Sequence, residues 1–585
     1  MKVALFLSVL VGFATHALAA TIYVPDDHPT IQAAVDAAAG GDTIIVRPGV
    51  YFENVTIDGK PLTVQSELGP DVTVIDGSGA APVLSVLDNW SDPFVIEGFT
   101  IRNGDGAGYD RGWGAAGVDF EGCFLTLTGN IIEDNVSDSW GTAVFVFCAP
   151  AEISANVIRN NRGGGIAFED GCGTVIDNTI VGNSGDAIYV NSYKSTGERT
   201  RPGKGGTIAG NLIAENGSGV YGGNDSSASV SNNVVVDNHG PGIWFDYSFL
   251  DAIGNVVARN DGPGIACTDM THGYIVDNLI LNNTADYGAG IYCKENLGWG
   301  LFAANNIIAG NSAAHEGGGI WFSHGMKGDA GLDTPTLVNN TIANNTAQIA
   351  GGGVYCGAGA NALVSNTILW NNSAPEGKEI WLGHDWWPST LDIDHCDVEG
   401  GQGSVYADTG CTLNWGAGMI DADPLFFDLA GGDFHLTFNS PCGNAGNGGA
   451  SGMPTVDFEG DPRGAWGGAD MGADEFFYHL YPVGEAVPGG TISIRVTGWP
   501  NGCTKLFLGS GIEDPPLPTM YGDLHLSRPL TMIYLGYIPQ NGVITLETTV
   551  PPGWIPSGIY PFQALVGGFE WPSTALTNLM VLTVD

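Results

Sequence analysis

A six-residue motif, Asn-x-[Ile/Val]-x-x-Asn, recurs ten times between positions 130 and 371 and constrains the fold of this 585-residue chain more than any other feature. The first Asn of each copy lies at 130, 156, 178, 211, 233, 255, 278, 306, 340 and 366. The shortest step is 22 residues, as from 156 to 178, so we expect the longer steps to contain inserted loops. A repeat this short cannot hold a strand and a helix, and no segment between the copies shows helical periodicity.

Each copy therefore predicts one coil of a parallel β-helix, in which equivalent residues of successive coils stack about 4.8 Å apart. The Ile or Val of each motif points into the core, and the two Asn columns lie at turns. There each side-chain amide donates to one neighbouring coil and accepts from the other, and Asn tolerates the left-handed backbone of such turns. Parallel crossovers are almost always right-handed. We thus predict an all-β fold, a right-handed parallel β-helix solenoid.

Glycine-rich corners introduce a second strand in many coils, as in Gly-Pro-Gly-Ile243 and Gly-Gly-Gly-Ile320. Side chains alternate along a strand, so the residue two places after each such Ile again points inward. That inward column contains Phe168, Val190, Phe245, Cys267, Cys293, Phe322 and Cys356. We interpret Cys267 and Cys293 as stacked core thiols rather than reactive groups.

The N-terminus is typical of a signal peptide, which we assign to residues 1–19. Lys2 precedes an apolar run over 3–13, and Ala17-Leu-Ala19 supplies a small-residue cleavage site. The run is too short to cross a bilayer, and no later stretch is long and apolar enough, so we expect no membrane span. The mature chain is predicted to be secreted, extracellular or at the cell surface, where disulfides form. Cys396 and Cys411 are the pair we favour.

The segment after the signal peptide resembles a known family. A short helix predicted over 30–39 and a strand and turn over 42–51 carry the sequences TIQAAVD and GDTIIVRPGVY. They are similar to the N-terminal cap of pectin-lyase-like β-helix proteins. Motifs between 420 and 475, such as IDADPLF and DFEGDPR, resemble the closing segment of secreted bacterial β-helix repeat proteins. The resemblance covers residues 20–476 and implies the architecture, but its members include lyases, hydrolases, esterases, epimerases and non-catalytic surface proteins.

The sequence pattern changes after Tyr478. The Asn motifs stop, and short β-rich runs appear over 491–497, 543–550 and 577–584. We predict a separate β-sandwich-like module over 477–585, of the kind that serves attachment or glycan binding.

A formal charge of −44 excludes nucleic acid as a partner. The same negative charge disfavours the binding of acidic polysaccharides, unless Ca²⁺ or a local basic patch bridges the protein and the polysaccharide. One inserted loop, 191–206, carries four cations, Lys194, Arg199, Arg201 and Lys204. These cations could contact an anionic glycan or a partner, although we prefer to explain the segment as a solvated loop.

The residue that follows each second-strand Ile or Val should point outward, and in this column most residues are aromatic. It includes Tyr189, Tyr221, Trp244, Tyr292, Trp321, Tyr355 and Trp381. A regular stripe of Tyr and Trp favours stacking on sugar rings. The alternatives are that the rings stack on one another, or that loops or a second subunit cover them.

Charged residues follow this stripe, and we predict a candidate catalytic cluster of Asp246, Asp269, Lys294, Glu295 and His324. Such groups could act as acid and base, could hold Ca²⁺ through carboxylate oxygens, or could form a solvated strand edge. Asp421, Asp423, Asp428 and Asp433 could also bind Ca²⁺, although we prefer to explain them as turn-forming residues.

Signature motifs of pectin methylesterases, polygalacturonases, pectate lyases and alginate epimerases are missing. We therefore expect a secreted protein that binds an extracellular polysaccharide along the outward aromatic and acidic face. Cleavage by a lyase or glycoside hydrolase mechanism is one hypothesis. The others are a non-catalytic adhesin and a structural surface protein whose aromatic column is an assembly interface.

Overall fold

The structure is a computed structural model that describes most of residues 19–476 and the strands of residues 480–584. Before residue 480 the undescribed segments are 1–18, 90–92, 107–113, 123, 138–140, 148–149, 171, 192–205, 225, 270, 295–299, 324–333, 384–386, 465–466 and 477–479. The predicted signal peptide lies, except for Ala19, outside the described residues. The chain divides into two compact units, residues 1–228 and 229–585, each described in turn.

The first unit begins with β1 (Thr21–Val24) and the helix α1 (Ile31–Ala37), which confirms the predicted short N-terminal helix. The helix begins where predicted because Thr30 caps it, its side-chain oxygen accepting from Ala33 N at 3.1 Å. Ile31, Ala34 and Val35 are buried. The helix therefore covers the start of the core in this unit.

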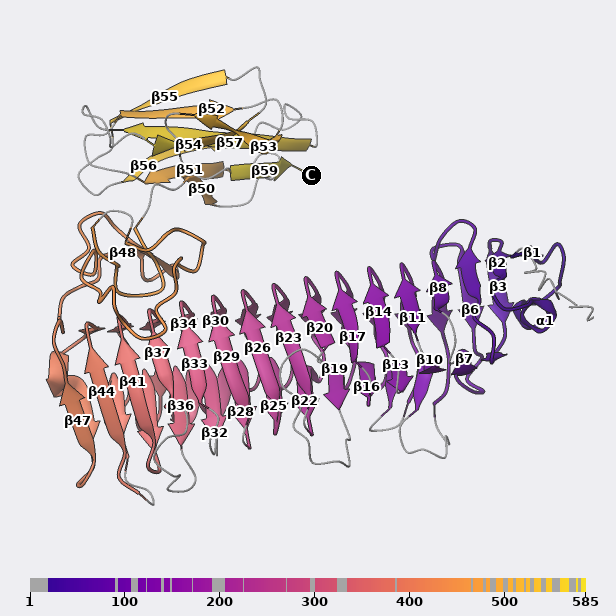
Figure 1. The fold of residues 1–585 in the computed structure, drawn as a ribbon, viewed down its shortest axis with the longest axis horizontal. Helices are drawn as coiled ribbons and strands as arrows, with labels where there is room; N and C mark the ends of the chain where they lie inside the picture. The colour runs from indigo at the N-terminus through magenta and orange to yellow at the C-terminus, as the bar shows by residue number, and fades with distance from the viewer. Residues whose placement is uncertain are drawn as a thin grey trace, which may run out of the picture. The chain divides into compact units, whose positions relative to one another are not determined.

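Three parallel sheets follow, and each coil contributes one strand to each of them (Figure 1). Sheet A of the first unit contains β1, β2 (Thr43–Val46), β5 (Thr63–Ser66), β8 (Phe94–Glu97), β11 (Leu125–Thr128), β14 (Pro150–Ser154), β17 (Cys172–Ile176) and β20 (Gly206–Ala209). Sheet B contains β3 (Gly49–Phe52), β6 (Thr73–Asp76), β9 (Thr100–Arg102), β12 (Ile131–Glu133), β15 (Val157–Arg159), β18 (Thr179–Val181) and β21 (Leu212–Ala214). Sheet C contains β4 (Val55–Asp58), β7 (Leu84–Asn89), β10 (Ala115–Gly122), β13 (Thr142–Phe147), β16 (Gly164–Glu169), β19 (Asp186–Asn191) and β22 (Ser218–Gly223).

The second unit has the same three-sheet construction, and β23 (Ser227–Ser231) spans the division between the units. Its sheet A contains β26 (Phe249–Ile253), β29 (His272–Val276), β33 (Leu301–Ala304), β37 (Thr336–Val338), β41 (Asn361–Ser365), β44 (Thr390–Asp394) and β47 (Thr412–Trp415). Its sheet B contains β24 (Val234–Val236), β27 (Val256–Ala258), β30 (Leu279–Leu281), β34 (Ile307–Ala309), β38 (Thr341–Ala343), β42 (Ile368–Trp370) and β45 (Asp397–Val398). Its sheet C contains β25 (Ile243–Asp246), β28 (Ile265–Thr268), β32 (Ile291–Lys294), β36 (Ile320–Ser323), β40 (Val354–Gly357), β43 (Ile380–Leu382) and β46 (Val405–Ala407), which follows the short 3-10 helix η1 (Gly401–Ser404).

The two Asn columns form the predicted hydrogen-bonded ladders. Asn178 is typical: its Nδ2 donates to Asn211 Oδ1 at 3.0 Å and to Ile153 O at 2.8 Å. Its Oδ1 accepts from the backbone N of Asn156 at 2.9 Å and from Asn156 Nδ2 at 3.0 Å. Each amide thus satisfies backbone groups at a buried corner, where water cannot reach them.

Two details of the ladder prediction are wrong. The left-handed residue of each corner is the one before the ladder Asn, for example Asp177 with φ 55° and Asn282 with φ 56°. The last motif copy is also displaced by one residue. Its Asn366 and Asn371 occupy left-handed positions, and Thr367 and Asn372 continue the ladders. Leu369, not Ile368, pairs with Ile342 in sheet B. The error arose because Asn suits both adjacent positions of the corner.

The inward column of sheet C is buried as predicted. Cys267 pairs in register with Cys293, and both thiols lie in the core. The predicted disulfide is wrong, because Cys396 and Cys411 are not joined. The Cys396 thiol instead lies 3.1 Å from the carbonyl oxygen of Asp394.

Residues 416–476 form a closing segment that packs on the outward side of sheet B in the last coils (Figure 1). It contains the two-stranded sheet of β48 (Phe426–Asp428) and β49 (Asp433–Leu436). Phe434 and Ala473 pack against Ile307, Ala309 and Ala343, which would otherwise be exposed on β34 and β38. The outward residues of sheet B are therefore apolar here because the chain returns to cover them.

Beyond residue 480 the chain forms antiparallel strands. One sheet is β50 (Leu480–Val483), β51 (Thr491–Thr497) and β56 (Val543–Thr549). A second is β55 (Thr531–Tyr537), β52 (Cys503–Leu508), β57 (Gly558–Gly567), β58 (Ala575–Leu576) and β59 (Met580–Val584), and a third pairs β53 (Ile512–Thr519) with β54 (Gly522–Leu526). The sandwich-like arrangement of this module stays a prediction. None of the helices among the described residues has the length and apolar character needed to cross a membrane.

Candidate functional site

The outward column of sheet C in the second unit is a stack of aromatic rings. Tyr292 and Trp321 have ring centroids 4.9 Å apart, Trp321 and Tyr355 5.8 Å, and Tyr355 and Trp381 4.4 Å, with interplanar angles of 9–21°. Tyr406 extends the stack, 6.1 Å from Trp381. The rings stack because strand register repeats the same outward position in every coil.

Most of these rings are buried. Tyr355 is 1% exposed, Trp381 8% and Trp321 9%. The corners beside them carry a small parallel sheet of β31 (Thr284–Tyr287), β35 (Ser312–Glu316) and β39 (Thr346–Ala347). From these corners Ala350 packs against the three rings, and the Tyr287 ring lies edge-on to Trp321 at 6.1 Å. The three rings therefore stabilise one another and leave little free face for a ligand, which is the alternative that the sequence left open for the column.

A left-handed glycine lets the corner approach each ring. Gly317 has φ +68°, and a Cβ there would lie 2.5 Å from the Cβ of Trp321. Gly351 has φ +65°, and a Cβ there would lie 2.9 Å from the Cβ of Tyr355. Only glycine suits both the backbone angle and the space at these positions.

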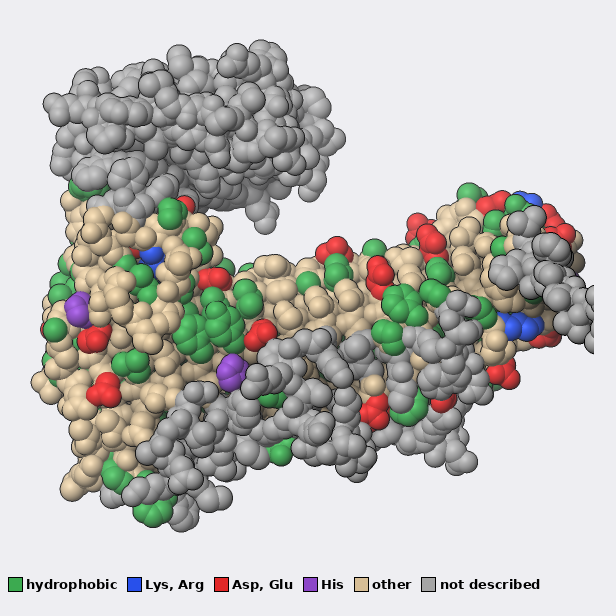
Figure 2. All heavy atoms as spheres, viewed as in Figure 1, with side chains coloured by type: hydrophobic (Ala, Val, Ile, Leu, Met, Phe, Trp, Pro, Cys, Tyr) green, Lys and Arg blue, Asp and Glu red, His purple; other side chains and the backbone are tan. Residues whose placement is uncertain are grey.

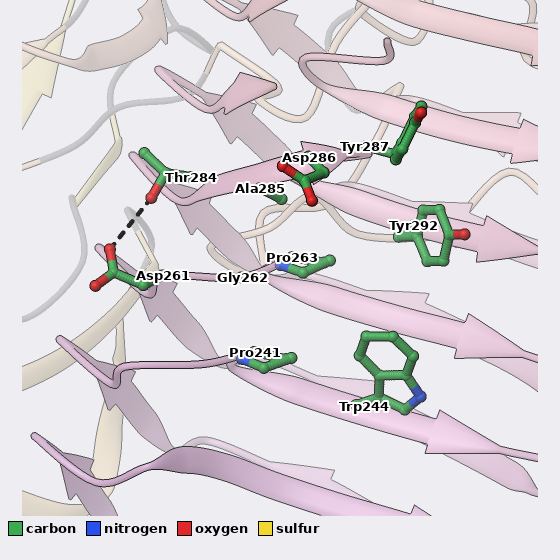
Figure 3. Close-up of a pocket in the computed structure, with 10 residues that line it drawn as sticks. All are labelled: Pro241, Trp244, Asp261, Gly262, Pro263, Thr284, Ala285, Asp286, Tyr287 and Tyr292. Atoms are coloured by element: carbon green, nitrogen blue, oxygen red, sulfur yellow. Dashed lines mark hydrogen bonds between the residues drawn. The ribbon is translucent and has the colours of Figure 1, made fainter. Parts of the chain in front are cut away.

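Toward the N-terminal end of the column in this unit the rings are less buried, because the corners beside them are shorter. The corner before β32 spans 284–290 and includes β31, whereas the corners before β25 and β28 are the short Gly-Pro-Gly segments within 239–242 and 261–264. A pocket of about 590 Å³ lies at this change (Figure 3). Its lining residues are Pro241, Trp244, Asp261, Gly262, Pro263, Thr284, Ala285, Asp286, Tyr287 and Tyr292.

Trp244 and Tyr292 flank the pocket, with ring centroids 6.2 Å apart and planes tilted by 45°. They lie on strands separated by β28, about 9.6 Å apart at two strand spacings, so the rings lean toward each other. They can do so because the residue in register between them is Ala266, which is fully buried. Tyr287 and Asp286 of β31 form the rim near Tyr292, on the side away from Trp244 (Figure 3).

A hydrogen-bonded chain leads from Trp244 to a pair of carboxylates. Trp244 Nε1 donates to Thr268 Oγ1 at 3.2 Å, and that hydroxyl donates to Asp246 Oδ1 at 2.7 Å. Burial raises the pKa of Asp246, and so do the charge of the neighbouring Asp269 and a hydrogen bond between the two carboxyl groups. The structure thus brings together two of the five residues predicted as catalytic.

The other three are placed as follows. Lys294 is exposed on β32, in register with Thr268, and its Cα is about 10 Å from that of Asp246 at two strand spacings. Glu295 and His324 lie outside the described residues. The described part of the predicted cluster is therefore a carboxylate pair with a lysine on the second strand along.

The first unit carries its own aromatic pair. Tyr189 and Tyr221 stack with centroids 5.5 Å apart and planes 3° apart. Burial raises the pKa of Tyr189 to about 12, and the nearby Glu169 adds to the shift. Asn191 Nδ2 donates to both oxygens of Glu169, at 3.0 and 2.9 Å. The predicted cations Lys194, Arg199, Arg201 and Lys204, on the loop between β19 and β20, lie outside the described residues.

Sequence reasoning missed the pocket's rim. Asp286 and Tyr287 belong to the inserted strand β31, which the repeat analysis treated only as excess length. The available signal was the longer step from Asn278 to Asn306. Asp261 follows a ladder Asn directly and accepts from Thr284 Oγ1 at 3.3 Å.

Among the described residues few cations lie beside this site, and Lys294 on β32 is one of them. Lys and Arg side chains are few on the face shown in Figure 2, where acidic groups are scattered. In the described part of the chain, the residues that line the pocket include two carboxylates and no cation. In the closing segment, the side chains of Asp423, Asp428 and Asp433 each accept from a backbone N–H two or three residues further on, as turn-forming residues do. Asp421 instead accepts from the N–H of Gly400, 21 residues earlier.

Two family models match parts of the chain. Residues 142–298 match the right-handed beta helix region, and residues 241–386 match the periplasmic copper-binding protein (NosD). The predicted hand and repeat architecture are thereby confirmed. No protein of curated function is similar enough in sequence to be recognised as a relative.

Several solved structures are similar in fold. One is the catalytic unit of a GH87 α-1,3-glucanase from Streptomyces thermodiastaticus strain HF3-3, with 13% identity, a TM-score of 0.34 and 69% of each chain covered. Another is the A-module of a mannuronan C-5 epimerase from Azotobacter vinelandii, with 12% identity, a TM-score of 0.30, and 67% of this chain and 94% of that chain covered. A third is a DFA-IIIase mutant from Arthrobacter chlorophenolicus A6 in complex with DFA-III, with 14% identity, a TM-score of 0.31, and 67% and 98% covered.

Proposed function

We propose that this right-handed β-helix protein binds a neutral polysaccharide in the pocket between Trp244, Tyr292 and Tyr287. The observation that carries the proposal is an open pocket of about 590 Å³, flanked by aromatic rings and lined by Asp261 and Asp286. Its volume is typical of small-molecule sites, at roughly 300–1,000 Å³. Sugar rings stack their C–H faces on aromatic rings, and their hydroxyls donate to carboxylates.

The charge of the site favours a neutral sugar over a uronate. Asp261 and Asp286 line the pocket, Asp246 and Asp269 follow Trp244 along the same face, and the whole chain carries a formal charge of −44. A uronate carboxylate would be repelled by these groups, whereas a hydroxyl gains an acceptor. If residues 1–19 act as the signal peptide that we expect, the protein binds its polysaccharide outside the cytoplasm.

The test is a panel of neutral glucans, xylans and mannans beside pectate and alginate, measured by affinity electrophoresis and calorimetry. We expect at least one neutral polysaccharide to bind, and Trp244→Ala to weaken that binding at least tenfold. Tyr274→Ala is the matched control, because Tyr274 is an aromatic residue 37% exposed on sheet A. Binding to pectate or alginate alone would refute the preference for neutral sugars, and unchanged binding by Trp244→Ala would refute the site.

Cleavage of the bound polysaccharide is a second candidate function. It is favoured by the hydrogen-bonded pair of Asp246 and Asp269, since two neighbouring carboxyl groups, one of them with a raised pKa, can serve as acid and base. Asp246→Asn should abolish chain shortening and leave binding nearly intact. Asp251→Asn is its control, because Asp251 is a partly buried carboxylate on sheet A whose pKa burial also raises. If no polysaccharide of the panel is shortened, cleavage is refuted and binding is the function that remains.

The product ends would distinguish the two enzyme classes. An unsaturated, ultraviolet-absorbing end indicates a lyase, and a saturated reducing end indicates a hydrolase. If the face is instead an assembly interface, the mass in solution should rise with concentration in the wild type and not in Trp244→Ala.

Copper binding is not part of the proposal, although the family matched over 241–386 is named for it. Within the described residues of that range, no three His, Cys, Asp or Glu side chains converge on one point. The cysteines there, Cys267, Cys293 and Cys356, are buried in the core, and desolvation raises the pKa of the Cys267 and Cys356 thiols.

A further inference from the structure

Three side chains of the metal-binding types meet in the closing segment, away from the pocket. His435 comes from β49, Glu459 from the turn after Asp457, and Asp474 from the last stretch of the segment. One nitrogen or oxygen of each lies within 4.8 Å of the others. His435 Nε2 is 3.1 Å from Glu459 Oε2. Ligands of one ion at bond lengths near 2.1 Å lie about 3.4 Å apart in tetrahedral geometry, so these atoms need only small shifts.

The histidine is oriented as metal-bound histidines are. Its Nδ1 lies 2.5 Å from Asp433 Oδ1, so the other nitrogen, Nε2, faces Glu459 and Asp474. A carboxylate on the far nitrogen fixes the ring and makes the near nitrogen a better ligand. Asp474 is held too, because its Oδ2 accepts from Leu436 N at 2.7 Å.

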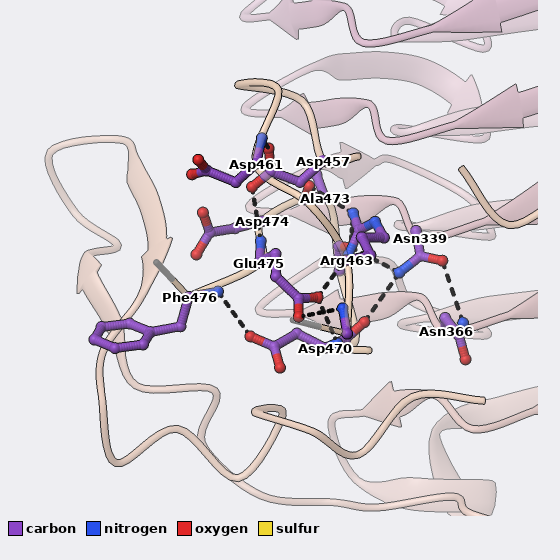
Figure 4. Close-up of polar contacts among 12 residues, drawn as sticks. Asn339, Asn366, Asp457, Asp461, Arg463, Asp470, Ala473, Asp474, Glu475 and Phe476 are labelled. Atoms are coloured by element: carbon purple, nitrogen blue, oxygen red, sulfur yellow. Dashed lines mark hydrogen bonds and ion pairs between the residues drawn. The ribbon is translucent and has the colours of Figure 1, made fainter. Parts of the chain in front are cut away.

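The charges around the cluster also call for a cation. The closing segment buries Asp457, Asp470, Asp474 and Glu475, each at most 3% exposed. Arg463 forms an ion pair with Glu475, in which its Nη1 lies 3.5 Å from Glu475 Oε2. Its Nη2 donates to Ala473 O at 2.8 Å. Figure 4 shows Glu475 directed toward Arg463 and the carboxyl group of Asp474 pointing away from it. Arg463 is thus paired with Glu475, while Asp474 accepts from Leu436 N and faces His435 and Glu459.

We propose that His435, Glu459 and Asp474 bind a divalent transition-metal ion, with Zn²⁺ as the probe. An imidazole nitrogen disfavours Ca²⁺ and Mg²⁺, which prefer oxygen ligands alone, and suits Zn²⁺ and its neighbours. Three protein ligands leave a fourth position for water. The ion ties together β49, the turn at 457–461 and the stretch 470–475, so it stabilises the closing segment over sheet B.

The experiment is calorimetric titration of chelator-treated full-length protein with Zn²⁺, followed by thermal unfolding with and without the ion. We expect one Zn²⁺ per chain, a higher unfolding temperature, and binding at least tenfold weaker to Ca²⁺. His435→Gln and Glu459→Gln should each weaken Zn²⁺ binding at least tenfold. His395→Gln is the matched control, since His395 also has a carboxylate partner, Asp394, 3.2 Å from its Nδ1, and is not in the cluster.

Absence of stoichiometric Zn²⁺ binding would overturn the proposal, as would equal binding by His435→Gln and the wild type. Equal affinity for Ca²⁺ would overturn the assignment to a transition metal. Glu459→Gln keeps the test decisive if His435→Gln fails to fold, because the Glu459 side chain is 31% exposed and its loss is better tolerated. The readout is independent of the pocket, so failure here leaves the polysaccharide proposal standing.

Discussion

Replacing one ladder Asn should destabilise the solenoid far more than replacing its neighbour in the same corner. Asn178 is 1% exposed and lies in the first unit, apart from the pocket. In Asn178→Ala, Asn156 loses the acceptor of its backbone N–H and one acceptor of its side-chain amide. Ile153 O loses the donor that lies 2.8 Å away. These are buried groups, so water cannot replace the lost partners without opening the corner.

The magnitude follows from the number of groups left without a partner. Each buried donor or acceptor that loses its hydrogen bond costs about 1–3 kcal/mol. Counting only the two donors of Asn156, the free energy of unfolding should fall by about 2–6 kcal/mol. The loss is local to this part of the first unit, because the coils of a solenoid are stabilised by their nearest neighbours.

The assay is denaturant unfolding combined with hydrogen exchange at the Asn156 amide. The control is Asp177→Gly, one residue earlier, where the side chain is exposed and the backbone is left-handed with φ 55°. The chain itself has glycine at this position in the next coil, Gly210 with φ 67°. We expect the control to be neutral or slightly stabilising. A loss below about 1 kcal/mol in Asn178→Ala, or an equal loss in both variants, would refute the account of the ladder.

Three further predictions concern the second unit. Burial raises the pKa of Glu379 to about 7 from its ordinary 4.5, so the folded chain holds this proton more tightly than the unfolded chain. Stability should therefore fall by about 3 kcal/mol as pH rises from about 4.5 to about 7, and denaturant titrations of Glu379→Gln should lack that slope. Gly317→Ala should cost about 2 kcal/mol or more in denaturant unfolding, because a Cβ would lie 2.5 Å from Trp321 Cβ at a left-handed φ; an unchanged midpoint would contradict this. Ala266→Leu should push the rings of Trp244 and Tyr292 apart and abolish polysaccharide binding in affinity electrophoresis, while full binding would show that the rings do not define the site.

The fold could be predicted from the sequence because its periodic signals are local and redundant. Nine of the ten motif copies place an inward aliphatic residue between two ladder Asn residues, so the strand register of sheet B is fixed many times over. The exception, the coil with Asn366, shows the limit. Asn is suited both to the ladder and to the left-handed position before it, and composition alone cannot choose between adjacent residues.

The site was less predictable because it depends on side chains whose positions do not follow from the sequence repeat. The outward stripe was correct as a column, as the register of Tyr292, Trp321 and Tyr355 shows. Its burial was not predictable, since the corners beside it come from inserted segments whose pairing is independent of the repeat. The proximity of Asp246 to Asp269 followed from their places on neighbouring coils, although the residue in register with Asp246 is Thr268. The path of the closing segment over sheet B required the three-dimensional structure.

The change from a short corner to a long one has a consequence for how such a chain can be altered. Ladder Asn residues close the core at 260 and 283 before the corner begins, so the corner's length is decoupled from the packing beneath it. Exchanging 261–264 for a copy of 284–290 should add one strand to the small outer sheet and leave the interior as it is. The rim formed by Asp286 and Tyr287 would then move by one strand spacing, about 4.8 Å, toward the N-terminus. The lengths of the corners therefore determine where along the solenoid the pocket lies. Insertions and deletions in the corners can shift a binding site without changing the core beneath it.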